Sequence, residues 1–225
     1  MDIYHFDFSA VLAHAPLLLH GAIVTVELTV IGSMGGLLIG VLAGWGRALG
    51  AGWLKRALGI YVECIRNTPF LIQLSFVYFG LPSFGVRLDG FSASLVAIVL
   101  HMGAYNAEIV RAGIEATPRG QFEAAASMAM TRTQTFRHVL LVPALTRVWP
   151  ALMTQVVLLL LDSAVCSQVS AKELTYAANY ISSQNFRAFE SYLVATAIYF
   201  ALALACQKAL LSLHGRVILR RRMAI

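Results

Sequence analysis

Charged residues are scarce in this chain. Only 12% of its 225 residues are Asp, Glu, Lys or Arg, whereas a soluble domain carries about 25%. Hydrophobic residues make up 59% of the chain, and several apolar runs exceed the roughly 20 residues that a helix needs to cross a bilayer. These proportions exclude a string of soluble domains. They predict a single all-α integral membrane domain that occupies residues 1–225.

The chain also lacks the common signatures of catalysis. No GxxxxGK[ST] phosphate loop, HExxH or GxSxG motif occurs in it, so we expect no catalytic residues and no ATPase site. Its cysteines, Cys64, Cys166 and Cys206, have neither CxxC nor metal-ligand spacing. We interpret them as small apolar side chains and expect no metal site.

Apolar stretches predict five transmembrane helices, at about 17–45, 57–80, 92–112, 149–165 and 189–211. With the N-terminus outside, only Arg87, Lys172 and Arg187 of the 17 Lys and Arg residues fall on the outer side. The opposite orientation would invert this ratio, so the positive-inside rule fixes the topology. It also explains the net charge of +6 without nucleic acid and places residues 117–145 in the cytoplasm.

Three local patterns refine these helices. In the first span, glycines recur every four residues and form a ridge that lets another helix approach closely: Gly32, Gly36, Gly40 and Gly44. In the second span, Pro69 lacks an N–H and clashes with the carbonyl of Ile65, which predicts a kink. The third is Ser170-x-x-Glu173, which predicts a capping box that opens an outer amphipathic helix ending near Ser183.

The cytoplasmic segment 117–145 has its own helix signals. Thr117-Pro118 is typical of a helix start, with a hydroxyl cap and proline at the first helical position. A helix over about 121–130 follows, and Thr131-x-x-Gln134 predicts a capping box for the next one. Apolar Phe122, Met128 and Met130 favour a docking surface over a solvated connector.

This segment resembles the EAA loop of ABC-transporter permeases, through residues 123–125, 129–131, 136–141 and 143. Residues 63–73 and 103–111 are similar to the polar amino acid branch of that family, the type I importers of the histidine, glutamine and arginine permease kind. The likeness extends over about 17–210. It implies that the loop forms a coupling helix between helices 3 and 4, which docks on the ATPase subunit.

The resemblance implies one set of docking residues: Gln121, Phe122, Glu123, Ala124, Ala125, Met128, Ala129 and Met130. Two departures occur. The family usually has glycine where Ala129 stands, and proline where Val142 stands, with Pro143 one place later. Because alanine suits a helix better than glycine, we expect the turn after the coupling helix to differ in detail.

The resemblance also implies partners and a location. A permease of this kind works in the bacterial inner membrane as a multi-pass subunit, paired with a second permease that is identical or related. Two ATP-binding subunits and an extracytoplasmic solute-binding protein complete the importer, which moves an amino acid by alternating access. The chain itself needs no cofactor, since ATP and Mg belong to the partner ATPase. No nucleic acid is expected.

Polar groups inside the spans form the predicted substrate pathway: Arg66, Asn67, Thr68, Gln73, Tyr105, Glu108 and Asp162. Arg66 offers a bidentate contact to a carboxylate, and Asp162 or Glu108 offers a partner for an ammonium group. A structural interpretation stays open beside this one. Glu63 with Arg66, and Glu108 with Arg111, are spaced i, i+3 and form natural intrahelical ion pairs.

Two other functions remain open at this point. One is a stand-alone proton-coupled transporter that uses Glu27, Glu108 or Asp162 as proton carriers. The other is a scaffold that transports nothing, which the polar residues inside the spans disfavour. Replacing Glu123 in the loop distinguishes the proton-coupled transporter from an ABC permease, because the substitution should uncouple only the ABC permease.

Overall fold

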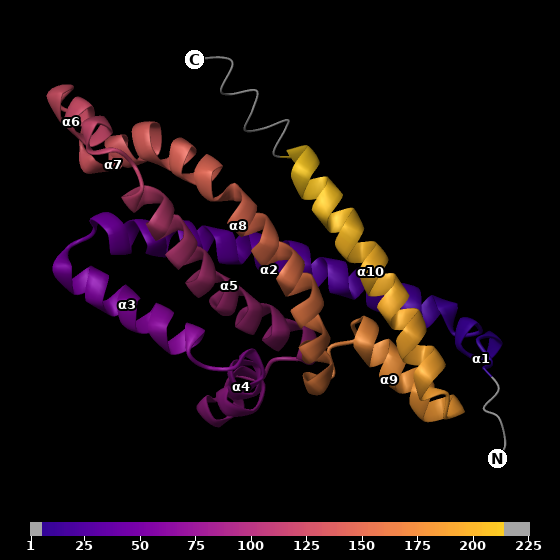
Figure 1. Ribbon diagram of the computed structural model, residues 1–225. Coiled ribbons are helices and arrows are strands. Elements are labelled where there is room, and N and C mark those ends of the chain that lie inside the picture. The colour runs from indigo at the N-terminus through magenta and orange to yellow at the C-terminus, as the bar shows by residue number, and fades with distance from the viewer. Residues whose placement is uncertain (1–5, 214–225) are drawn as a thin grey trace. The chain divides into compact units, whose positions relative to one another are not determined.

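A computed structural model describes residues 6–213, and every regular element in that range is a helix (Figure 1). The all-α prediction is therefore confirmed for the described residues. The longest helices are α2 (Ala15–Leu49), α5 (Gly90–Glu115), α8 (Leu141–Asp162) and α10 (Ala188–Leu213). Four of the basic residues that the predicted topology puts on the inner side lie outside the described residues: Arg216, Arg220, Arg221 and Arg222.

Shorter helices connect the long ones. Before α5 these are α1 (Ser9–Leu12), α3 (Gly52–Arg66), α4 (Phe70–Ser75), the π-helix η1 (Phe76–Gly80) and the 3-10 helix η2 (Leu81–Phe84). After α5 they are α6 (Arg119–Ser127), α7 (Arg132–Gln134), the π-helix η3 (Thr135–Leu140), the 3-10 helix η4 (Ser163–Val169) and α9 (Leu174–Asn185).

Four helical stretches are long and apolar enough to cross a membrane: Ala15–Leu49, Gly90–Glu115, Pro143–Val169 and Ala188–Leu213. A shorter apolar stretch, Phe70–Phe84, lies where the sequence predicts the second half of its second span. That predicted span is divided, because α3 ends at Arg66 and α4 begins at Phe70.

The chain forms two compact units. Of the described residues, the first contains 6–32, Phe70–Ile98 and Val157–Ala209, and the second contains Ser33–Pro69, Val99–Val156 and 210–213. Long helices such as α2 and α5 contribute residues to both units.

In the first unit, α9 lies on a buried cluster: Val11, Leu18, Leu174, Ala177, Ala178, Ile181 and Ala195. The predicted Ser170 capping box is wrong. Glu173 itself is the N-cap of α9, and its carboxylate accepts hydrogen bonds from the backbone N–H groups of Thr175 (2.8 Å) and Tyr176 (2.7 Å). The Tyr199 hydroxyl donates a third, at 2.6 Å. Burial raises the pKa of Glu173 above its usual value.

In the second unit, the glycine ridge of α2 packs against α5. A Cβ added to Gly36 would meet the Cβ of Met102, and one added to Gly40 would meet that of Asn106. A Cβ on Gly44 would lie 2.8 Å from the carbonyl oxygen of Ala107. The predicted close helix approach is therefore confirmed, and α5 is the partner.

The order of these contacts shows that α2 and α5 run in the same direction within the second unit. Residue numbers rise together along both helices, from Gly36 beside Met102 to Gly44 beside Val110. Helix α3 packs against the same two helices, with Val62 buried against Ala43 and Ala104.

Replacing Gly40 with alanine should destabilise the second unit by about 1–3 kcal/mol, because the added methyl overpacks a contact made largely by backbone and Cβ atoms. In addition to Asn106, it would lie 3.1 Å from the backbone nitrogen of Ala107. Thermal unfolding of the purified chain in detergent measures the effect.

Gly59→Ala is the matched control, since nothing lies within 4 Å of a Cβ at Gly59 in the middle of α3. Alanine there should leave stability unchanged or raise it by up to about 1 kcal/mol through its helix propensity. Equal losses from the two substitutions would contradict close α2–α5 packing.

Candidate functional site

Helix α6, which the sequence predicts to be cytoplasmic, begins later than its sequence signal predicts. Pro118 is its N-cap, and the Thr117 hydroxyl donates to the carbonyl of Gly113 at 3.4 Å instead of capping the helix. The helix ends at Ser127, where the sequence predicts an end near residue 130. A short helix with a largely exposed surface nevertheless occupies the expected position.

The predicted docking residues differ in exposure. The side chains exposed on α6 and on the turn after it are those of Gln121, Glu123, Ala124, Met128 and Ala129. Phe122 and Met130 are half-buried, and Ala125 is buried. Met128 is the most prominent apolar side chain among them, with 65% of its surface exposed. The helix therefore presents a carboxylate and a flexible thioether outward, while Ala125 faces the protein.

Ala129 lies after α6 and not within it, which corrects the predicted helix over about 121–130. Its φ is +54°, in the left-handed region that alanine enters only at a cost of about 1–2 kcal/mol. The N–H of Met130 donates to the carbonyl of Ala125 at 3.1 Å, and that of Ala129 to Ala126 at 2.9 Å. These are the bonds of a Schellman cap, so the backbone adopts a glycine-type turn with alanine in it.

The rest of the cytoplasmic segment is fixed to the bundle. The predicted capping box is confirmed, since Thr131 N–H donates to Gln134 Oε1 (2.8 Å) and Gln134 N–H to Thr131 Oγ1 (3.3 Å). Phe136 is buried, and its ring stacks on Trp45 of α2 with centroids 5.0 Å apart. It joins a core that also contains Ile114 of α5, so the chain that follows α6 packs against both helices.

The break between α3 and α4 is a full interruption and not the predicted kink. Pro69 lies between the two helices, and residues 67–69 are not helical. The Asn67 side-chain amide donates to the Glu63 carbonyl (2.8 Å) and to Glu63 Oε2 (3.1 Å). The Thr68 hydroxyl donates to the carbonyl of Cys64 at 2.9 Å. The Thr68 side chain thus satisfies the Cys64 carbonyl, which the interruption leaves without its backbone donor, whereas the Glu63 carbonyl also keeps a bond from the Asn67 backbone N–H at 3.1 Å.

Arg66, the last residue of α3, contacts α5. Its guanidinium carbon lies 5.3 Å from the ring centroid of Tyr105, a cation–π distance. Tyr105 in turn packs on His101, with centroids 4.8 Å apart. The predicted Glu63–Arg66 ion pair is not among the salt bridges formed within residues 6–213, because Glu63 binds Asn67 and Arg66 lies over Tyr105.

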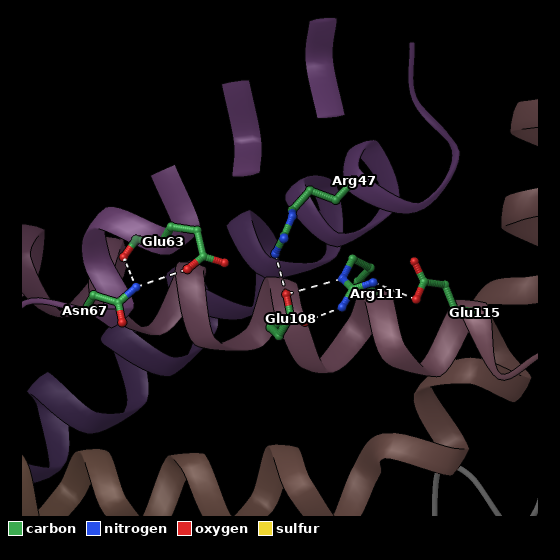
Figure 2. Close-up of polar contacts among 6 residues, drawn as sticks. All are labelled: Arg47, Glu63, Asn67, Glu108, Arg111 and Glu115. Atoms are coloured by element: carbon green, nitrogen blue, oxygen red, sulfur yellow. Dashed lines mark hydrogen bonds and ion pairs between the residues drawn. The ribbon is translucent and has the colours of Figure 1, made fainter. Parts of the chain in front are cut away.

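Glu108 lies between two arginines (Figure 2). Its predicted pair with Arg111 is confirmed, and its second oxygen accepts a hydrogen bond from Arg47 of α2. Arg111 extends the network to Glu115 at 2.6 Å. Sequence reasoning missed the Arg47 contact, because 61 residues separate it from Glu108 and no local pattern relates them.

The other predicted pathway residues belong to the first unit. Gln73 is half-buried in α4, and Asp162 is the exposed last residue of α8. Within residues 6–213, no three His, Cys, Asp or Glu side chains gather closely enough to hold a metal ion.

Comparison with known proteins identifies the family. A profile described as "Binding-protein-dependent transport system inner membrane component" matches residues 36–219. The chain belongs to this family. It is 36% identical to the Escherichia coli (strain K12) glutamine transport system permease protein GlnP over 215 residues, which cover 94% of this chain and 98% of that protein. It is 39% identical over 152 residues to the probable glutamine ABC transporter permease protein GlnM of Bacillus subtilis, 68% of this chain and 69% of that one.

Solved structures agree with the family assignment. A chain from the "crystal structure of an amino acid ABC transporter with histidines" superposes with a TM-score of 0.84 at 35% identity, covering 95% of this chain and 100% of that one. An inward-facing MetNI methionine ABC transporter shares the fold alone, with a TM-score of 0.71 at 23% identity over 87% of this chain and 95% of that one. The protein is thus a permease subunit of the bacterial inner membrane.

Replacing Ala129 with glycine should stabilise the turn after α6 by about 1 kcal/mol, since glycine adopts a positive φ without steric cost. Ala126→Gly, inside α6, is the matched control and should weaken the helix by a similar amount. Hydrogen exchange of the α6 amides measures both. Slower exchange in Ala129→Gly and faster exchange in Ala126→Gly are expected, and the same direction in both would contradict the left-handed cap.

Replacing Glu108 with glutamine should cost about 2 kcal/mol of stability, because two partly buried arginines lose the charged acceptor of their hydrogen bonds. Glu115→Gln removes a more exposed i, i+4 pair and should cost about 0.5 kcal/mol or less. The thermal unfolding midpoints of the two variants in detergent give the comparison. A larger loss from Glu115→Gln would show that Glu108 is not the centre of the network.

Proposed function

We propose that this chain is the membrane-spanning permease subunit of an ATP-driven ABC importer for polar amino acids. The observation that carries the proposal is the 36% identity to a glutamine permease over 94% of the chain. The likeness to a chain of an amino acid ABC transporter, with a TM-score of 0.84 at 35% identity, supports it from the structure.

The proposed topology has five crossings with the N-terminus outside. Four stretches have the length and hydropathy of spans. Since α2 and α5 run in the same direction in the second unit, the chain between them has to return across the membrane. Helix α3, followed by α4 and η1, supplies that crossing in two pieces. Arg47, Lys55 and Arg56 surround the α2–α3 connection, which favours a cytoplasmic position for it.

The coupling element of the proposal is α6. Its exposed Gln121, Glu123 and Met128 form a surface for an ATPase subunit, and its link through Phe136 to α2 and α5 passes motion to the spans. Two such ATPase subunits carry ATP and Mg. A second permease, identical or related, and an extracytoplasmic solute-binding protein complete the importer.

Substrate would cross by alternating access along the polar residues of the spans. The proposed pathway residues are Arg66, Asn67, Thr68, Gln73, Tyr105 and Asp162, with Glu108 at the cytoplasmic end. The interruption of α3 and α4 supports this, because transporters place substrate sites at discontinuous helices near the middle of the bilayer.

Replacing Glu123 with alanine should lower ATP-driven uptake at least tenfold, because an exposed charge-assisted contact to the ATPase subunit contributes about 1.5–3 kcal/mol. The measurement is uptake of labelled amino acids into proteoliposomes that hold the complete importer, with ATP inside or outside. Glu115→Ala is the control, since it removes the same charge at the cytoplasmic end of α5, outside α6.

Two results would contradict the proposal. Uptake that persists without ATP and follows a pH gradient would indicate a proton-coupled transporter. A permease that purifies from its native host without an ATPase subunit and still takes up solute would also indicate a transporter that needs no ATPase. Loss of uptake in both glutamate variants would reject only the assignment of docking to Glu123.

A further inference from the structure

We propose that Glu63 and Arg66 together bind the zwitterionic head group of the transported amino acid, Glu63 its ammonium and Arg66 its carboxylate. This inference rests on the proposed function and deepens it. It also differs from the sequence-based interpretation, which pairs Arg66 with Asp162 or Glu108 for this task.

The depth of the two residues is the first argument. Tyr105, over which Arg66 lies, is ten residues from the cytoplasmic end of α5 at Glu115. At a rise of 1.5 Å per residue, it stands about 15 Å from that end, inside the stretch Gly90–Glu115 that is long and apolar enough to cross a membrane. A charged group at that depth is costly in lipid and faces a water-filled path or a ligand.

The availability of both charges is the second argument. Arg66 and Glu63 are exposed side chains. The guanidinium carbon of Arg66 lies 5.3 Å from the centroid of the Tyr105 ring, and none of the salt bridges within residues 6–213 involves Arg66. Asn67 holds Oε2 of Glu63 at 3.1 Å, and none of the hydrogen bonds within residues 6–213 involves Oε1. The Arg66 guanidinium and the Glu63 carboxylate are thus each positioned by a neutral neighbour, and each can still bind a ligand group of opposite charge.

Spacing is the third argument. Residues three apart on a helix have Cβ atoms about 5–6 Å apart, so the two head groups can converge on a carboxylate and an ammonium that share one α-carbon. The pair stands in the last turn of α3, next to the interruption at residues 67–69. The negative end of the helix dipole lies there and also favours an ammonium group.

Glu108 is the weaker candidate for the ammonium. Both of its oxygens already accept hydrogen bonds from arginines, one from Arg47 and Arg111 and the other from Arg111 (Figure 2). A ligand ammonium would have to compete with two permanent cations for it. Glu63, on the left of the same view, binds only the neutral amide of Asn67.

The stack beneath Arg66 gives His101 and Tyr105 a positioning role. Ring contacts at 4.8 Å between them and 5.3 Å to Arg66 form a column across α5. The column limits the rotamers of a long, exposed arginine and so lowers the entropy cost of binding a carboxylate.

The test uses the purified importer without its solute-binding protein and a mixture of ¹⁴C-labelled L-amino acids as the first probe. The amino acid retained best is then compared with its α-amide, which lacks the carboxylate, and with its N-acetyl derivative, which lacks the ammonium. For the wild-type chain, each derivative should bind about 10- to 100-fold more weakly than the amino acid, the loss of one charged hydrogen bond.

Two variants then assign each charge. Glu63→Gln keeps an oxygen that can accept from Asn67, and it should bind the amino acid about 10- to 100-fold more weakly. N-acetylation should cost this variant nothing further, while the α-amide remains penalised. Arg66→Gln should also bind the amino acid about 10- to 100-fold more weakly. In this variant the α-amide should cost nothing further, while the N-acetyl derivative remains penalised. Glu115→Gln, which removes a carboxylate at the cytoplasmic end of α5, should behave like the wild-type chain.

Three outcomes would overturn the proposal. The first is an unchanged affinity of Glu63→Gln for the amino acid, and the second is that the wild-type importer binds no labelled amino acid. The third is that both variants bind the amino acid more weakly but still bind both derivatives more weakly than the amino acid. ATP-driven uptake in proteoliposomes is measured in parallel. Uptake that persists beside any of these outcomes rejects only the head-group assignment, whereas absence of ATP-driven uptake rejects the proposed function itself.

Discussion

The second unit depends on the close approach of α2 and α5 along a line of glycines. With no Cβ at Gly36, Gly40 and Gly44, the two helices come together at backbone distance and stay parallel. Helices in a bilayer gain little from the hydrophobic effect against each other, so contact of this kind is their main source of cohesion. The Arg47–Glu108 bond then joins the same two helices near their cytoplasmic ends.

That helix pair also determines how motion reaches the spans. Phe136 packs on Trp45 of α2 and in a core with Val110 and Ile114 of α5, so the segment after α6 is attached to both helices. Packed cores shift between discrete arrangements and do not deform continuously. In the proposed importer, a displacement of α6 would therefore reach α2 and α5 together. The Schellman cap at Ala129 and the capping box at Thr131 keep the intervening turn short.

Local interactions were predictable from the sequence, and those that depend on competing neighbours were not. The capping box of Thr131 and the pair of Glu108 with Arg111 involve residues three apart, and both are present. The Ser170 box failed because Glu173, which the pattern assigns to the third position, caps α9 itself. The Arg47 contact joins residues far apart in sequence. At Ala129 the helix propensity of alanine was misleading, because two backbone hydrogen bonds impose a left-handed conformation there. The substrate pathway remains a prediction.

The interruption at Pro69 shows why two opposite charges three residues apart need not pair. An intrahelical ion pair contributes only about 0.2–0.5 kcal/mol, and a cation–π contact of Arg66 with Tyr105 contributes about as much or more. Asn67, released from the helix by the proline that follows, bonds to the Glu63 carboxylate. Each charge is thus stabilised separately and the pair stays open. An arrangement in which neither charge neutralises the other, beside the membrane-spanning stretch Gly90–Glu115, favours the proposed zwitterion as the group that satisfies both.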